Sequence, residues 1–283
     1  MSYVLPNKSL LEETSPEINE DSKYYNLSRI TFKKDLDNKL LFPVGLNSED
    51  KYFIDLEHRS SMLILGETGS GKSVFLNSII ISLLLKNNPD ELKFLFIDPR
   101  GAELGLYNEI PHMLKPVIRT KEQALYELKS IAKELKKRQE LFVENDVSNI
   151  GDYNDRWDKA LPHIIIIIDE ASGIIGEKNF EDIMLEMITE GYRYGIHIIM
   201  ATSSNLRNKL STFFIRAFNY VLTFDLASKE QSDYIKINEA DLLTVYGEAL
   251  IKCNGNKIID LQTPYVSDDD INKIISYILK QNK

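Results

Sequence analysis

Apolar and polar positions along this chain fall into blocks that predict alternating strands and helices. Short apolar runs without helical spacing, typical of strands buried on both faces, occupy residues 62–65, 93–97, 163–168, 196–201 and 220–224. Helical patterns are expected after Ser73 and over residues 122–142, 180–192, 206–217 and 267–279. Because strands alternate with helices, we predict an α/β fold with a mainly parallel central sheet flanked by helices.

Strand pairs around polar turns predict peripheral β-hairpins. Residues 40–56 flank Asn47-Ser48-Glu49-Asp50, and residues 248–261 flank Asn254-Gly255. Residues 144–159 are polar and are expected to form a surface loop. Residues 1–38 are polar with weak periodicity, which predicts an N-terminal extension or strap ahead of one domain at 39–283.

Composition excludes several classes of protein. The chain has 283 residues, of which 43% are hydrophobic and 27% charged, as in soluble globular proteins. The single cysteine, Cys253, rules out an intrachain disulfide, and no metal-ligand spacing surrounds His112 or His197, so both histidines are expected to be structural. No apolar run approaches the ~20 residues of a membrane span and no signal peptide is evident, which predicts a cytoplasmic protein. A net charge of −9 argues against a general nucleic-acid coat, although basic residues can still line one channel of a DNA machine.

A glycine-rich segment follows the first apolar run and precedes a helix. Its G-x-x-x-x-G-K-S spacing in that context is the pattern of a phosphate-binding loop, which a chance Gly-rich turn rarely matches. The glycines let successive N–H groups face phosphate oxygens, and the helix adds its positive end. Lys72 is placed to reach the β- and γ-phosphates, and the Ser73 hydroxyl to bind Mg²⁺. The predicted nucleotide-binding residues are Gly66, Glu67, Thr68, Gly69, Ser70, Gly71, Lys72, Ser73 and Val74.

Two further apolar runs end in polar residues that suit phosphate chemistry. The run at 163–168 delivers Asp169 and Glu170 to the carboxyl edge of the sheet, where ligands bind in open α/β folds. Asp169 there would hold Mg²⁺, directly or through water. Glu170 can aim at a water in line with the γ-phosphate, the position of a general base in ATP hydrolysis. After the run at 196–201, Thr202 and Ser203 can sense the γ-phosphate or serve as ordinary turn residues.

With these residues in place, the chain resembles the FtsK/SpoIIIE family of motor ATPases. The similar stretches, in the family's order, are ILGETGSGKSVFLNSII, FIDPRGAEL, YNEIPHMLKPV, LPHIIIIIDEAS, GIHIIMAT, EADLLTVYGEAL and YVSDDDI. The resemblance implies a RecA-like P-loop ATPase domain, ATP and Mg²⁺ as ligands, and a ring that is usually hexameric. It also implies translocation on double-stranded DNA threaded through that ring. Lys72 and Ser73 match its phosphate-loop residues, and Asp169 and Glu170 its magnesium and water-activating carboxylates.

The chain departs from the family where residues sense γ-phosphate or act on a neighbour's nucleotide. The family commonly has Ala-Thr-Gln-Arg-Pro where this chain has Ala-Thr-Ser-Ser-Asn at 201–205. The family's arginine ahead of GIH falls at Tyr192, so Arg193, one residue later on the predicted helix, is the candidate catalytic arginine in trans. Of the family's later Asp-Ser-Arg, only Ser232 is left. Nucleotide binding is therefore better supported than vigorous hydrolysis.

Two functions follow from the resemblance. The first is an ATP-driven double-stranded DNA translocase in DNA transfer or in chromosome or plasmid segregation, recruited to the membrane by a partner protein if it acts there. Its DNA contacts are expected at Arg207 and Lys209, which follow the apolar run at 196–201, and at Arg100, where the family more often has lysine. The alternative is a slowly hydrolysing scaffold or motor subunit of a conjugation or type VII-like protein secretion complex. The intact phosphate loop and acidic pair favour the first, and the acidic pI and altered sensors the second.

Overall fold

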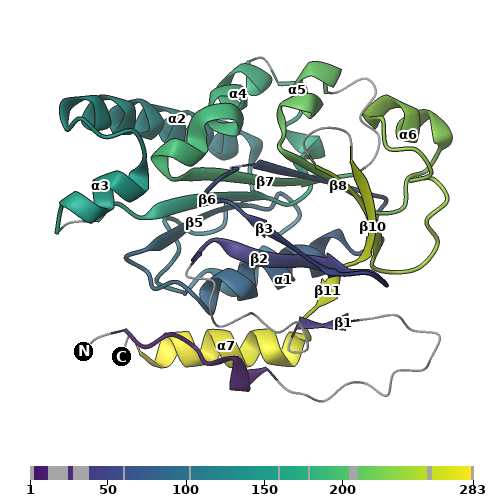
Figure 1. Cartoon of the computed structure of the whole chain (residues 1–283), viewed down its shortest axis with the longest axis horizontal. Coiled ribbons are helices and arrows are strands. Elements are labelled where there is room, and N and C mark those ends of the chain that lie inside the picture. Colours follow the sequence, from purple (N-terminus) through teal and green to yellow (C-terminus); the bar gives the residue numbers. More distant parts are fainter. Residues whose placement is uncertain are drawn as a thin grey trace. The chain divides into compact units, whose positions relative to one another are not determined.

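The chain forms two compact units, whose elements Figure 1 labels. The computed structural model describes residues 3–11, 25–27, 38–59, 61–101, 103–158, 160–177, 179–203, 210–253 and 257–281. Unit 1 comprises Met1–Asp55, Leu65–Asn88 and Leu222–Lys283, and unit 2 comprises Leu56–Ile64 and Pro89–Val221. The phosphate loop thus belongs to unit 1 and the acidic pair to unit 2.

Unit 2 is built on a parallel sheet of the predicted apolar runs. Its strand order is β8 (Tyr220–Thr223), β4 (Ser61–Leu65), β7 (Ile196–Thr202), β6 (His163–Ile168) and β5 (Leu92–Ile97), with the last residues of β4 and β8 counted in unit 1. β5, β6 and β7 run parallel, and Ile168 pairs with both Ile97 and Met200. These strands are buried almost throughout, because helices and loops cover an apolar sheet on both faces. The prediction of a parallel α/β sheet is confirmed here.

The longer helices of unit 2 pack on its sheet and on each other. α4 (Phe180–Glu190) lies over β7, and α2 (Lys121–Glu144) runs beside α4 (Figure 1). α2 buries Leu128, Ile131 and Leu135, as its spacing predicted. The predicted helix at 180–192 is shorter, since α4 passes into a 3₁₀ turn, η5 (Gly191–Tyr194). The predicted helix at 206–217 appears as α5 (Thr212–Ala217), capped by the Ser211 hydroxyl, while residues 204–209 lie outside the described ranges.

The prediction of a surface loop at 144–159 is wrong. This segment contains α3 (Ile150–Arg156), whose N-terminus is capped by the Asn149 side chain accepting from the Asp152 N–H at 2.9 Å. Tyr153 stacks between Phe142 of α2 and Trp157, with ring centroids 5.3 and 4.9 Å apart. Polar composition hid this helix because a few aromatic contacts, rather than an apolar stripe, hold it on α2.

Unit 1 combines an antiparallel sheet with two long helices. Its strands follow the order β3 (Lys51–Asp55), β2 (Leu41–Leu46), β10 (Ile258–Gln262) and β9 (Glu248–Lys252), which confirms both predicted strand pairs, while the predicted turn at Asn254-Gly255 lies outside the described residues. α1 (Lys72–Leu84) lies between β2 and α7 (Asp268–Lys280) and also contacts β11 (Pro264–Tyr265) (Figure 1). The Ser267 hydroxyl caps α7 as predicted, by accepting from the Asp270 N–H at 3.2 Å. A short helix, α6 (Lys229–Ile235), was not predicted.

The described parts of the predicted N-terminal extension contact unit 1. The 3₁₀ turn η1 (Lys8–Leu10) lies on α7, and β1 (Tyr25–Asn26) pairs in parallel with β11. The Val4 backbone exchanges two hydrogen bonds of 2.7 Å with the Gln281 side chain. A boundary at residue 38 stays a prediction. Within the described ranges, every helix is too short or too polar to span a membrane.

Candidate active site

The phosphate loop of unit 1 is a tight turn that requires glycine at its first position. Gly66 has φ +154°, and a Cβ there would lie 2.5 Å from Ser70 Oγ and 2.9 Å from Phe224 Cβ. Gly71, at φ +113°, is the N-cap residue of α1. The loop ends at the positive end of a helix, where the first N–H groups have no partners within the helix. This arrangement suits an anion such as a polyphosphate.

Lys72 is the first residue of α1 and folds back over the loop. Its side chain is buried, and Nζ donates to Gly66 O and Glu67 O, both at 2.8 Å. An ammonium group is therefore held directly over the turn whose N–H groups would cradle phosphate. Ser70 Oγ is buried with no hydrogen-bond partner among the described residues, so a further donor is available beside it. These residues fit the triphosphate of a nucleotide.

The rest of the predicted loop is anchored at its base and exposed at its tip. The Glu67 N–H donates to Asp225 O at 3.0 Å, and the Phe224 N–H donates to Leu65 O at 2.8 Å. Thr68 and Gly69 are exposed, Ser73 is half-buried, and Val74 is 41% exposed. The base of the loop is thus fixed to the chain after β8, while its tip and the start of α1 stay accessible.

A glycine that sequence reasoning missed lies against the loop. The Gly247 N lies 3.8 Å from a Cβ placed on Gly71, and Gly247 itself has φ +81°. The Gln262 side chain covers the other side of Gly247, where its Nε2 donates to Tyr246 O at 2.9 Å. The segment YGEAL contains this glycine, but nothing in its spacing indicated a contact with the phosphate loop.

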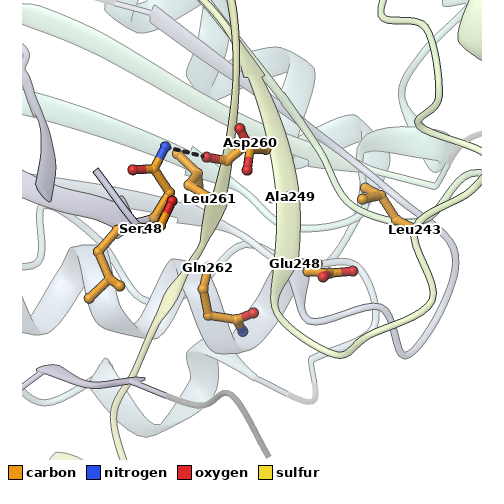
Figure 2. A pocket seen from close by; sticks show the side chains of 9 residues that line it. Ser48, Leu243, Glu248, Ala249, Asp260, Leu261 and Gln262 are labelled. Atoms are coloured by element: carbon orange, nitrogen blue, oxygen red, sulfur yellow. Dashed lines mark hydrogen bonds between the residues drawn. The ribbon is translucent and has the colours of Figure 1, made fainter. Parts of the chain in front are cut away.

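Next to Gln262, unit 1 has a cavity of about 430 Å³. It is lined by the turn after β2 and by β9 and β10 (Figure 2). Figure 2 shows Gln262 and Glu248 toward one end and Asp260 toward the other, where Asn47 Nδ2 donates to Asp260 O at 3.1 Å. No motif of the sequence indicated this cavity, because its walls come from segments far apart in the chain.

In unit 2, polar residues follow β5, β6 and β7 at one edge of the sheet. Asp98 is buried, and its carboxylate accepts from the N–H groups of Gly101, Glu103 and Leu104 at 2.8, 3.2 and 3.1 Å. These bonds fix the loop after β5. Asp169 is also buried, and its N–H donates to Ile97 O at 2.9 Å, which extends the β5–β6 pairing by one residue.

Glu170 lies among several donors on this edge. Its φ of +58° is in the left-handed region, and the residue is 7% exposed. Oε1 accepts from the N–H groups of Ser172 and Ser203 at 3.4 and 3.3 Å, and from the hydroxyls of Thr202 and Ser203 at 3.4 and 3.3 Å. Oε2 lies 3.3 Å from Arg100 Nη2. The structure thus brings both predicted sensor residues to Glu170, and it adds Arg100, which was expected only at DNA.

Comparison with known proteins decides the family. The sequence profile of the FtsK/SpoIIIE family matches residues 28–217, which is more than half of the chain. The chain belongs to the FtsK/SpoIIIE family. It is 32% identical to the DNA translocase SpoIIIE of Bacillus subtilis (strain 168) over 262 residues, covering 87% of this chain and 33% of that protein. It is 33% identical to the DNA translocase FtsK of Streptococcus pneumoniae over 261 residues, covering 87% and 34%. The chain therefore spans about a third of the length of these curated relatives.

Solved structures share the fold of this FtsK/SpoIIIE chain. The pCW3 conjugation coupling protein TcpA superposes with a TM-score of 0.78 at 24% identity, covering 92% of this chain and 74% of that one. The Type VII secretion ATPase EccC of Thermomonospora curvata superposes with a TM-score of 0.72 at 20% identity, covering 85% and 31%. At these identities the likeness shows the fold alone, a P-loop ATPase fold.

The basic residues predicted to act in trans or on DNA are only partly described by the structure. Arg193 lies on the 3₁₀ turn η5, which corrects the expectation of an α-helix at this position. Its side chain is 52% exposed, donates from Nε to the Tyr192 hydroxyl at 3.0 Å and lies 3.6 Å from Glu190 Oε2. Arg207 and Lys209 lie outside the described residues, so their DNA contacts stay predictions. Among the described residues, no group of three or more His, Cys, Asp or Glu side chains gathers as a metal site.

Proposed function

We propose that this chain is the ATPase motor of a double-stranded DNA translocase, acting in DNA transfer or in chromosome or plasmid segregation. One observation carries the proposal: this FtsK/SpoIIIE chain has both an intact phosphate loop, with Lys72 held over it, and a buried Glu170 after β6. The name DNA translocase belongs to relatives that are 32–33% identical over the matched region.

Each site residue has a role that its chemistry supports. The loop N–H groups and Lys72 bind the phosphates of ATP, and Glu170 accepts the proton of the attacking water. Thr202 and Ser203 act as sensors, since their hydroxyls already donate to Glu170. Ser73 and Asp169 supply the hard oxygen ligands that Mg²⁺ prefers. When bound, that ion neutralises charge on the β- and γ-phosphates.

Movement on DNA requires features outside a single described chain. We assign the DNA contacts to Arg100, Arg207 and Lys209, and the catalytic arginine in trans to Arg193. These assignments require a ring, a homo-hexamer in our proposal, with DNA in its channel. A cytoplasmic location, with a membrane-bound partner where transfer occurs at the membrane, completes the proposal.

One observation favours a second function, a slowly hydrolysing scaffold or motor subunit of a conjugation or type VII-like protein secretion complex. The carboxylate of Glu170 is engaged by Arg100 and by the hydroxyls of Thr202 and Ser203, and Ser203 stands where the family commonly has glutamine. An ATPase whose general base already accepts several hydrogen bonds hydrolyses ATP slowly until those contacts are broken.

Displacement of a third strand from duplex DNA separates the two functions. The full chain is incubated with ATP and a duplex carrying a labelled triplex-forming strand downstream of a free loading site. A translocase displaces that strand only with ATP, and Lys72→Ala abolishes displacement together with ATP binding, because it removes the cation at the β- and γ-phosphates. Lys133→Ala, which removes an exposed lysine of α2, is the matched control and keeps parental displacement. ATP binding without displacement at any protein concentration would favour the scaffold.

A further inference from the structure

Arg100 and Glu170 form an ion pair with unequal exposure. The side chain of Arg100 is 56% exposed, whereas that of Glu170 is 8% exposed. The backbone that carries Arg100 is fixed, because Asp98 accepts N–H groups from the residues that follow it. Arg100 can therefore move its long side chain, more than half of which is exposed, without moving its loop.

We propose that Arg100 is a positioning residue that exchanges between the Glu170 carboxylate and a phosphate of the DNA backbone. In the absence of DNA it holds Glu170 against Thr202 and Ser203. When a DNA phosphate takes the guanidinium, Glu170 Oε2 loses the Arg100 contact and becomes a better acceptor for the proton of the attacking water. DNA contact and the general base of hydrolysis are thereby linked through one arginine. The inference rests on the proposed function and deepens it.

The geometry around Glu170 gives the direction of this exchange. A carboxylate offers about four lone-pair positions, and the described donors already occupy both oxygens. A base whose lone pairs are engaged has little capacity to take a proton from water. The contacts are nevertheless long, at 3.3–3.4 Å, where hydrogen bonds are weak. The carboxylate is therefore held by several weak contacts that a competitor can break.

A DNA phosphate is a strong competitor for this arginine. The planar guanidinium binds phosphate oxygens with two parallel hydrogen bonds, a geometry that a single contact to Glu170 Oε2 does not use. Because more than half of the Arg100 side chain is exposed, solvent screens the ion pair and the pair contributes only modestly to stability. An exchange of this kind needs no change in the fold of unit 2.

The exchange predicts that Glu170 weakens DNA binding by the nucleotide-free chain. Glu170→Gln removes the competing carboxylate, so affinity for a duplex of fixed length should rise about fivefold, which corresponds to about 1 kcal/mol. In the Arg100→Gln background the same change should leave affinity unaltered. Arg100→Lys keeps a cation at this position and should preserve part of the rise. Fluorescence anisotropy at several salt concentrations measures all four variants, and Arg100→Gln should lower the salt slope by about one.

A matched control separates this effect from general charge. Glu177→Gln also removes one negative charge in unit 2 and also frees a basic side chain, that of Lys121, whose Nζ lies 2.8 Å from Glu177. A rise with Glu170→Gln that exceeds the control and disappears with Arg100→Gln supports the exchange. Equal effects of both glutamate changes, or a rise that persists in Arg100→Gln, would overturn it. Absence of DNA binding in every variant would overturn the proposed function itself, and the exchange with it.

Discussion

Acid should destabilise this chain through one buried histidine. His197 of β7 is fully buried, and its Nε2 lies 3.0 Å from His163 Nδ1 of β6, with the two rings stacked. Burial, the neighbouring His163 and the guanidinium of Arg138 in α2 lower the pKa of His197 well below 6.5. Arg138 cannot move away easily, because it is itself buried and donates to Tyr194 O at 2.7 Å.

The sign and size of the effect follow from linkage. His197 takes up a proton near pH 6.5 when the chain is unfolded, and only at much lower pH when it is folded. The stabilisation is therefore fully present above about pH 6.5 and is lost as pH falls below it. For as long as the folded histidine stays neutral, each further pH unit of acidification costs on the order of 1 kcal/mol. That is a large share of the roughly 5–15 kcal/mol that stabilises a folded domain.

Urea unfolding of parent and variants measures this contribution. His197→Gln removes the titrating group, so its loss of stability between about pH 7 and about pH 5 should be smaller than that of the parent, by on the order of 1 kcal/mol or more. His58→Gln, which replaces an exposed histidine by the same residue, is the matched control for the substitution itself. If His197→Gln loses as much stability in acid as the parent, the buried histidine is not the group that responds.

Further substitutions test the site and the fold. Glu170→Gln should bind ATP with parental affinity by calorimetry but release phosphate at least about 10²-fold more slowly, and an unchanged rate would exclude Glu170 as the base. If Arg193 acts in trans, specific activity of the parent should rise with protein concentration and Arg193→Ala should abolish that rise, an effect on the order of 10³; a flat profile in both proteins would contradict the role. Gly247→Ala should cost about 1–3 kcal/mol in urea unfolding, because a Cβ at φ +81° would also meet the Gln262 side chain. Gly176→Ala, at φ +88° with open space around it, should cost less, and equal costs would remove Gln262 from the explanation.

The strands of the parallel sheet were predictable because their physics is local. Residues 164–168 are apolar at every position, which is the pattern of a strand buried on both faces. The phosphate loop was predictable for the same reason, since its glycines and Lys72 act within a few residues of one another. Helices α3 and α6 were missed because each is one to two turns long and carries too few apolar positions to show a period.

The surroundings of Glu170 could be predicted only in part. The parallel register places the ends of β6 and β7 side by side, so proximity of Thr202 to the acidic pair follows from strand order. The contact with Arg100 depends on side-chain rotamers and on the path of a loop fixed by Asp98, neither of which spacing encodes. The same limit applies to Gly247, whose contact with the phosphate loop joins segments far apart in the chain.

The aromatic stack on α3 gives the chain an intrinsic optical probe. Trp157 is the sole tryptophan of the sequence, and it stacks on Tyr153 with the two ring planes at 13°. Because the indole belongs to unit 2, its fluorescence reports the state of that unit, whereas circular dichroism follows the helices of both. Coincident transitions in the two signals would mean that the units unfold together. Separate transitions would mean that each unit has its own free energy of unfolding, to be fitted separately.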